Sequence, residues 1–206
     1  MRVLSPVLLL IFAVAHVSHA QEPIHPTLYI GAGMTQARGD DARYSDTGFH
    51  LASSLGRSLT DRLAFHAGAG IHYLPMNPDD LSEAFGLDRH GYSELEGGDF
   101  IAITAMADVR YFPLDDSRLN PYVLAGLGLV HTRRGDLDFE YFGVPETYPA
   151  AANSRFGINF GGGAHYPVTS TVSVFGQTAY TIAFTDDESV RMLPLQIGLF
   201  IDLVGF

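Results

Sequence analysis

The chain has 206 residues, of which 23 are Asp or Glu and 12 are basic, so its formal net charge is −11 at pH 7. All of the basic residues are Arg, and no Cys is present. The lack of thiols excludes a disulfide framework, a cysteine nucleophile, a cysteine zinc site and a lipoprotein anchor. The acidic balance argues against nucleic acid as a partner, because phosphate backbones are bound by clustered positive charge.

The N-terminus differs in composition from the rest of the chain. A positive charge near the start is followed by the apolar run Val7–Val14 and then by the small residues Ser18 and Ala20. This order is typical of a secretory signal peptide, and the apolar run is too short to cross a bilayer as a helix. We expect residues 1–20 to be a cleaved signal peptide, with an uncleaved anchor as the alternative. Residues 21–206 are then expected to form one domain.

Beyond the signal peptide, no apolar stretch reaches 18 residues, so no transmembrane helix is predicted. Apolar residues alternate with polar ones instead. Within residues 99–111, Ile101 and Val109 share one parity. Asp108 and Arg110 share the other. Because successive side chains of a strand point to opposite faces, this pattern predicts a strand with one apolar and one polar face.

The same alternation recurs along the chain and predicts eight strands. Each is longer than the usual soluble strand of about 5–6 residues and suits a tilted transmembrane strand, which needs about 9–11. Residues 121–132 have apolar side chains at both parities, which leaves the facing of that strand open. The predicted strands are residues 27–37, 47–57, 63–74, 99–111, 121–132, 155–166, 171–183 and 193–203.

The connections between these segments alternate between short and long. Short turns at one end and long loops at the other are the layout of outer-membrane barrels, with the turns and both termini on the periplasmic side. The short connections are residues 58–62, 113–120 and 167–170, and the longer ones are 38–46, 75–98, 133–153 and 185–190.

An apolar and a polar face would also fit a soluble periplasmic barrel, a lipocalin-like binder with its apolar face inward. The polar face carries many small residues and few charges, which suits a narrow lumen filled by side chains better than a solvated surface. Aromatic residues beside the turns suit bilayer interfaces. These are Tyr73, Tyr111, Phe112, Tyr122, Tyr166 and Phe184.

We therefore predict an all-β protein, an eight-stranded antiparallel up-and-down transmembrane β-barrel with its apolar face toward lipid. Charges inside a closed barrel must be paired or hydrated, so the polar face is expected to form a network in the lumen. Its predicted members are Asp108, Arg110, Arg155, Asn159, Gln177, Gln196 and Asp202.

The stretches Asn120–Gly128 (NPYVLAGLG) and Phe156–Gly163 (FGINFGGG), with the apolar alternation that ends at Phe206, resemble the small OmpA/OmpX-type outer-membrane β-barrel domains. The resemblance extends over nearly all of residues 21–206. It implies eight antiparallel strands, location in the cell outer membrane, insertion by the barrel-assembly machinery and a structural or surface-interaction role. Phe206 departs from the pattern, because it is out of register with the apolar residues of the last strand.

No catalytic site, metal site or cofactor is predicted. A serine nucleophile needs a histidine that shares its face, two residues away on one strand, and no histidine after residue 20 has a serine two positions later. A triad formed across strands stays open. His66 and His72 share the lumen parity, with His50 as a further candidate, but His66 and His72 are separated by roughly 20 Å of strand and cannot hold one ion together.

The long loops are acidic, as Asp79, Asp80 and Asp136 illustrate. Their carboxylates are candidates for divalent cations that bridge to lipopolysaccharide. The spacing of an EF-hand is absent, and a merely solvated loop face is the favoured interpretation. The expected partners are outer-membrane lipid and lipopolysaccharide. The leading functional prediction is a structural or surface-interaction barrel, and the alternatives are a narrow passive, porin-like pore and the soluble lipocalin-like binder.

Overall fold

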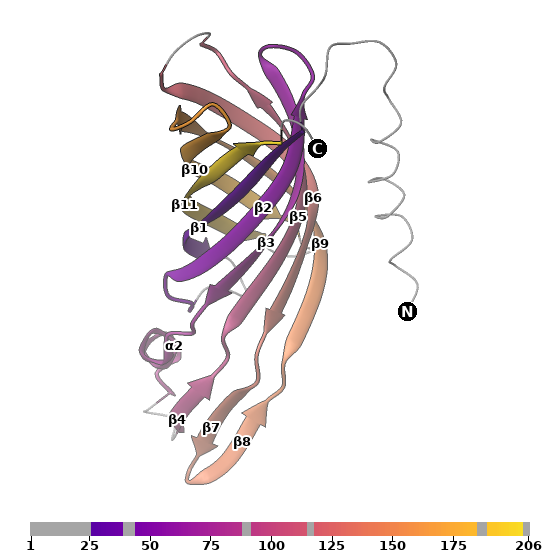
Figure 1. Cartoon of the computed structure of the whole chain (residues 1–206). Helices are drawn as coiled ribbons and strands as arrows, with labels where there is room; N and C mark the ends of the chain where they lie inside the picture. The colour runs from indigo at the N-terminus through magenta and orange to yellow at the C-terminus, as the bar shows by residue number, and fades with distance from the viewer. Residues whose placement is uncertain (1–25, 39–43, 88–91, 115–117, 185–188, 204–206) are drawn as a thin grey trace.

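The computed structural model describes residues 26–38, 44–87, 92–114, 118–184 and 189–203 (Figure 1). The predicted signal peptide and Phe206 lie outside these residues. The one helix described is α2 (Pro78–Phe85). The strands are β1 (Pro26–Arg38), β2 (Gly48–Ser58), β3 (Leu63–Leu74), β4 (Tyr92–Gly97), β5 (Phe100–Tyr111), β6 (Asn120–Arg134), β7 (Leu137–Tyr141), β8 (Val144–Tyr148), β9 (Ala151–Pro167), β10 (Val172–Ala183) and β11 (Val190–Asp202).

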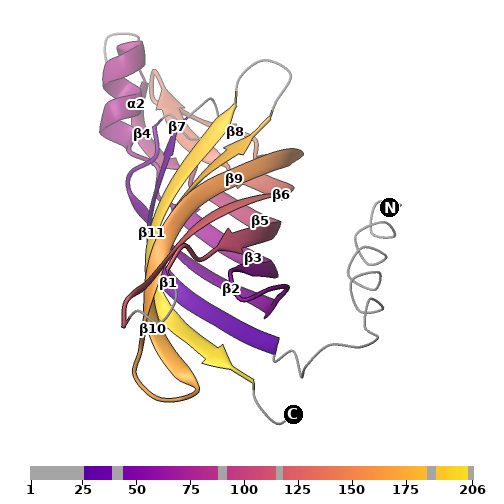
Figure 2. The ribbon, with the colours of Figure 1, turned by 90° about the horizontal axis from the view of Figure 1, so that it is seen from above.

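Eight of these strands form a closed antiparallel barrel in the order β1-β11-β10-β9-β6-β5-β3-β2. Closure is made by the first and last strands, which pair from Thr27 opposite Asp202 to Arg38 opposite Arg191. The predicted eight-stranded barrel is thus confirmed, and Figure 2 shows the strands wrapping around a common interior. Within the described part of the chain, no helix is long and apolar enough to span a membrane.

Alternation along each strand divides the side chains between the lumen and the outer surface. In β5, Thr104 and Asp108 are buried while Ile103 and Val109 are exposed, as the sequence pattern predicts. The facing of β6, which the sequence leaves open, is settled by its register. Its even-numbered residues, including Leu124 and Val130, point into the lumen, and its odd-numbered residues point outward.

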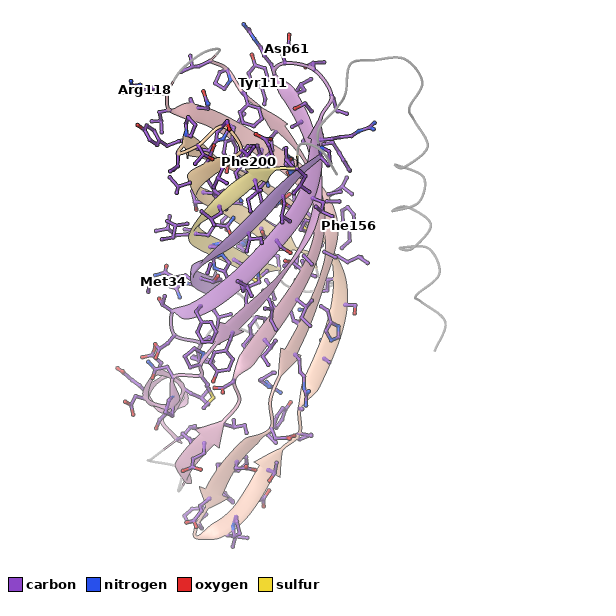
Figure 3. All side chains as sticks on the ribbon, in the orientation of Figure 1. Met34, Asp61, Tyr111, Arg118, Phe156 and Phe200 are labelled. Carbon is purple, nitrogen blue, oxygen red and sulfur yellow. The ribbon has the colours of Figure 1, made fainter. Side chains whose placement is uncertain are left out.

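The short connections all lie at one end of the barrel. Two of them are tight turns, closed by backbone hydrogen bonds from Leu59 to Leu63 and from Val168 to Val172. Asp61 and Arg118 mark this end in Figure 3. The described parts of the β3–β5 and β6–β9 connections lie at the opposite end and extend beyond the barrel.

Two of the long connections contain regular structure where the sequence pattern predicts only loops. The β3–β5 connection holds α2, whose first turn is capped by the Asn77 side chain accepting a hydrogen bond from the Asp80 amide at 3.0 Å. The same connection holds β4, and the β6–β9 connection holds β7 and β8. These three strands form a second sheet in the order β4-β7-β8, which projects from the end of the barrel (Figure 1).

Candidate functional site

The outer surface of the barrel is a broad apolar band. Large apolar side chains on it are strongly exposed, for example Ile197 at 74% and Leu195 at 65%. Met34 and Phe156 point away from the barrel wall in Figure 3. Exposed apolar area of this extent has no stable place in water, so the band is the surface that contacts lipid.

At the turn end, the lumen is filled around a buried ion pair. Arg110 Nε donates to Asp108 Oδ2 at 3.0 Å, and both side chains are at most 10% exposed. The guanidinium lies over the ring of Tyr29 at 3.9 Å and faces that of Tyr122 at 5.4 Å. Pairing and stacking together compensate the cost of removing this charge from water.

An aromatic layer surrounds this ion pair and fills the turn end of the lumen. Tyr29 contacts Phe200 and Phe175 with ring centroids 4.8 and 5.2 Å apart, and His165 contacts Phe200 at 5.0 Å. Phe112 packs on Tyr122 at 5.5 Å. The prediction that Tyr122 and Phe112 lie at the bilayer interface is therefore wrong. The inward parity of Tyr122 places it under Arg110, and Phe112 follows it into the lumen.

Toward the middle of the lumen, a histidine pair spans two neighbouring strands. His50 of β2 is opposite His72 of β3 in the register, and the Nδ1 atom of each lies 2.9 Å from the Thr35 hydroxyl. His50 Nε2 is 3.0 Å from Gln196 Oε1. The shared facing of these histidines follows from the sequence pattern, whereas their pairing follows only from the register of the β2–β3 hairpin.

A cavity of about 100 Å³ separates the histidine pair from the Arg110 ion pair. Its lining includes Asn159, whose Oδ1 is buried without a protein partner. The buried Tyr29 hydroxyl and Arg110 Nη1 are likewise without a partner in the described part of the chain. A polar cavity of this size has room for several water molecules, which would satisfy these atoms.

The end of the lumen beside the long connections is filled by an apolar layer. Its side chains come from six strands and are at most 1% exposed. This layer lies on one side of the cavity and the aromatic layer lies on the other, so apolar and aromatic side chains occupy both ends of the lumen. The members of the apolar layer are Ala37, Leu74, Phe100, Ala102, Val130, Ala183, Val190 and Met192.

The structure brings together five of the seven residues predicted to form the lumen network. Asp108, Arg110, Asn159, Gln177 and Gln196 all line the cavity. Gln177 Oε1 accepts a hydrogen bond from the Tyr122 hydroxyl at 2.8 Å, an interaction that the sequence pattern does not indicate.

The other two predicted residues lie away from the cavity. Arg155 is nearer the end of the barrel beside the long connections, where its Nη1 donates to the Thr132 hydroxyl at 3.0 Å. Asp202 is at the turn end of β11, opposite Thr27 of β1.

The structure also bears on catalysis and metal binding. One histidine–serine contact crosses two strands on the outer surface, where His131 Nδ1 lies 2.9 Å from Ser154 Oγ. No carboxylate of the described residues hydrogen-bonds this histidine, so the pair lacks the third member of a triad. Within the same residues, no group of three or more His, Asp or Glu side chains is placed to hold a metal ion.

Beyond the barrel, the β7–β8 hairpin carries its aromatic side chains on one face, together with Glu146, and two further carboxylates on the other. Tyr141, Val144 and Tyr148 are exposed on the first face, with Tyr148 held under Arg134 at 4.7 Å. Asp138 and Glu140 alternate onto the other face. The hairpin turns at Phe142 and Gly143, both with positive φ, and the Phe142 side chain is 72% exposed.

Comparisons with known proteins agree with this geometry. The crystal structure of Neisserial surface protein A has a TM-score of 0.61 at 17% identity, covering 88% of this chain and 99% of that one. A major outer membrane protein from Thermus thermophilus has a TM-score of 0.56 at 16% identity, covering 87% and 99%. A search of curated proteins found no significant sequence match. The family described as the outer membrane protein beta-barrel domain matches residues 7–199. The chain therefore belongs to the outer membrane protein beta-barrel domain family, and it is located in the outer membrane.

Proposed function

We propose that this protein is a sealed membrane anchor that displays the β7–β8 hairpin for contact with proteins outside the cell. The observation that carries the proposal is Phe142, a large apolar side chain exposed at the tip of the sheet. A non-glycine residue with positive φ costs of order 1 kcal/mol, and such strain accumulates at functional sites. Asn, Asp or Gly would fit this turn with less strain.

The free edge of β8 indicates how the hairpin makes such contacts. In a two-residue turn closed by the Tyr141–Val144 pair, the backbone of Pro145 and Thr147 faces away from β7. Proline has no amide hydrogen to offer an added strand, so Pro145 blunts this edge. Recognition then depends on the aromatic side chains, which favour a partner with an apolar patch, and on the carboxylates of the hairpin, which favour basic residues beside that patch.

The packing of side chains at both ends of the lumen supports an anchoring role over transport or catalysis. An apolar layer and an aromatic layer fill its two ends, and the polar groups between them face an internal cavity of water size. An eight-stranded barrel has an interior about wide enough for side chains alone. We accordingly propose that the barrel is neither a pore nor an enzyme.

Two experiments test the proposal. Cells that express the wild-type protein should adhere to surfaces coated with a basic protein that exposes an apolar patch more than cells with empty vector. Cells that express Phe142→Ser/Tyr148→Ser should not, although both proteins show the same heat-modifiable migration on gels. Equal adherence of the wild type and vector cells would contradict the interaction role. Purified protein in planar bilayers should produce no conductance steps. Regular steps would contradict the anchor proposal and support the narrow passive pore instead.

A further inference from the structure

Two arginines face each other on the lipid side of the barrel at its extracellular end. Arg38, the last residue of β1, is the direct cross-strand partner of Arg191, near the start of β11. Both side chains are exposed, and both have the outward parity of their strands. Residues opposite each other in an antiparallel pair have Cβ atoms about 5 Å apart, so two positive charges are held side by side.

Nothing in the described part of the chain neutralises this pair. Arg38 Nη1 donates only to the adjacent Ala37 carbonyl at 3.3 Å, and Arg191 Nε donates to Ser189 Oγ at 3.1 Å. Neither forms an ion pair with a described carboxylate, although the chain as a whole is strongly acidic. Like charges directly opposite each other destabilise a sheet. Most of the N–H donors of the two guanidiniums remain available for an anion.

The position of the pair identifies the kind of anion. Immediately below it in the β1–β11 register, Gln36 is opposite Leu193, and Met34 is opposite Leu195. Met34 points out from the barrel wall (Figure 3). The two arginines thus lie at the upper border of the apolar band, where an amphiphile would place its charged group with its acyl chains alongside the leucines below.

We propose that Arg38 and Arg191 together bind a phosphate of lipopolysaccharide, the phosphorylated glycolipid of the outer leaflet. Each guanidinium offers a planar fork of donors that matches phosphate oxygens, and a shared phosphate converts the repulsion between the arginines into two favourable contacts. The inference depends on the orientation of the barrel in the membrane. It does not depend on the role of the β7–β8 hairpin, since the two sites share no residue.

The test measures binding of diphosphoryl lipid A to the purified full-length protein in neutral detergent by native mass spectrometry. Arg38→Gln and Arg191→Gln should each weaken binding by about tenfold or more, the usual effect of losing a charge-assisted contact. The double variant should lose less than the product of the two single effects, because both arginines contact one phosphate. Dephosphorylated lipid A should bind the wild type as weakly as diphosphoryl lipid A binds the double variant.

Arg133→Gln is the matched control. Arg133 is also exposed and outward-facing near the extracellular end of the barrel, but it is opposite Ile101 rather than a second arginine. This variant should bind lipid A like the wild type. An equal loss in Arg133→Gln would overturn the proposal by showing that general positive charge, and not the pair, holds the lipid.

Two further measurements distinguish a lipopolysaccharide site from a general anion site and from a purely structural role of the arginines. Phosphatidylglycerol or inorganic phosphate binding as tightly as lipid A would overturn the assignment to lipopolysaccharide. Without lipid, Arg191→Gln should unfold at the same temperature as the wild type or a higher one, because the substitution relieves the repulsion. A lower unfolding temperature would show that the arginines stabilise the fold without a ligand, which would also overturn the proposal.

Discussion

The imidazole rings of His50 and His72 stack with centroids 5.1 Å apart, and both face the single hydroxyl of Thr35. This geometry sets the direction of each hydrogen bond. His50 Nε2–H donates to the Gln196 oxygen, so His50 Nδ1 is an acceptor for the Thr35 hydroxyl proton. His72 Nδ1–H must then donate to the Thr35 oxygen. With Gln196 Oε1 as the acceptor, the two rings have opposite tautomers, and one hydroxyl links three strands.

Replacing Thr35 by Val should remove both bonds while preserving the side-chain shape. Two buried ring nitrogens would lose their partner, and we expect the free energy of unfolding to fall by about 2–3 kcal/mol. The measurement is the urea midpoint of the gel-mobility transition in lipid vesicles. Thr47→Val is the control, because Thr47 is exposed and accepts one long bond of 3.3 Å from Gln36. An unchanged midpoint for Thr35→Val would show that the shared hydroxyl does not stabilise the lumen.

The Asp108–Arg110 pair should respond strongly to loss of either partner. Asp108→Asn leaves a buried guanidinium without its counter-charge, and Arg110→Met leaves a buried carboxylate. Each should destabilise the barrel by about 3–5 kcal/mol, whereas the double variant should lose much less than the sum. Urea unfolding of all three variants completes the cycle. Additive losses would mean that the two side chains act independently. The control is Asp61→Asn, which removes a carboxylate from an exposed turn and should leave the free energy of unfolding unchanged.

Gly56 is required by the ring that lies over it. A Cβ atom at this position would lie 2.2 Å from His66 Nδ1, far inside contact distance. Gly56→Ala should therefore destabilise the barrel by about 1–3 kcal/mol. In a protein that already carries His66→Ala, the ring is gone, so adding Gly56→Ala should lower the free energy of unfolding by less than it does in the wild type. If the Gly56→Ala effect is the same with and without His66, the ring is not what requires glycine here.

The lack of native cysteine allows the orientation to be tested with single-cysteine variants. Phe142→Cys at the hairpin tip should react with a membrane-impermeant maleimide on intact cells. Asp61→Cys, at the turn end in Figure 3, should react only after the outer membrane is permeabilised. The reverse pattern would place the β7–β8 hairpin in the periplasm and would contradict both the display role and the lipopolysaccharide site.

The sequence predicts the barrel well because strand facing follows a two-residue period. Ile103 and Thr104 are adjacent, yet their burial differs as the alternation requires. The same parity is ambiguous in β6, since the lumen accepts apolar residues such as Val130 once they belong to an apolar layer. The error at Tyr122 has a related cause. The position of Tyr122 near a strand end suggests a place at the bilayer interface. Its even number in β6, however, turns the side chain into the lumen, where it faces Arg110.

Contacts that depend on register could not be predicted from single segments. The pairing of His50 with His72, and of Arg38 with Arg191, requires knowing which residues are opposite each other in neighbouring strands. The extracellular sheet was missed for a different reason. Strands β7 and β8 have five residues each, too few for alternation to be distinguished from loop sequence. Their turn also has Phe142 at the position before Gly143 where Asn, Asp or Gly usually signals such a turn.

The seam between β1 and β11 also determines the order in which the barrel can form. The β2–β3 hairpin needs only a four-residue turn, residues 59–62, and can form from local contacts. By contrast, Thr27 finds its partner Asp202 only after nearly the whole chain has been made. Contacts this distant in sequence form late and slowly. Until the seam closes, β1 and β11 present unpaired edges, and the exported chain must be protected from pairing with other copies of itself.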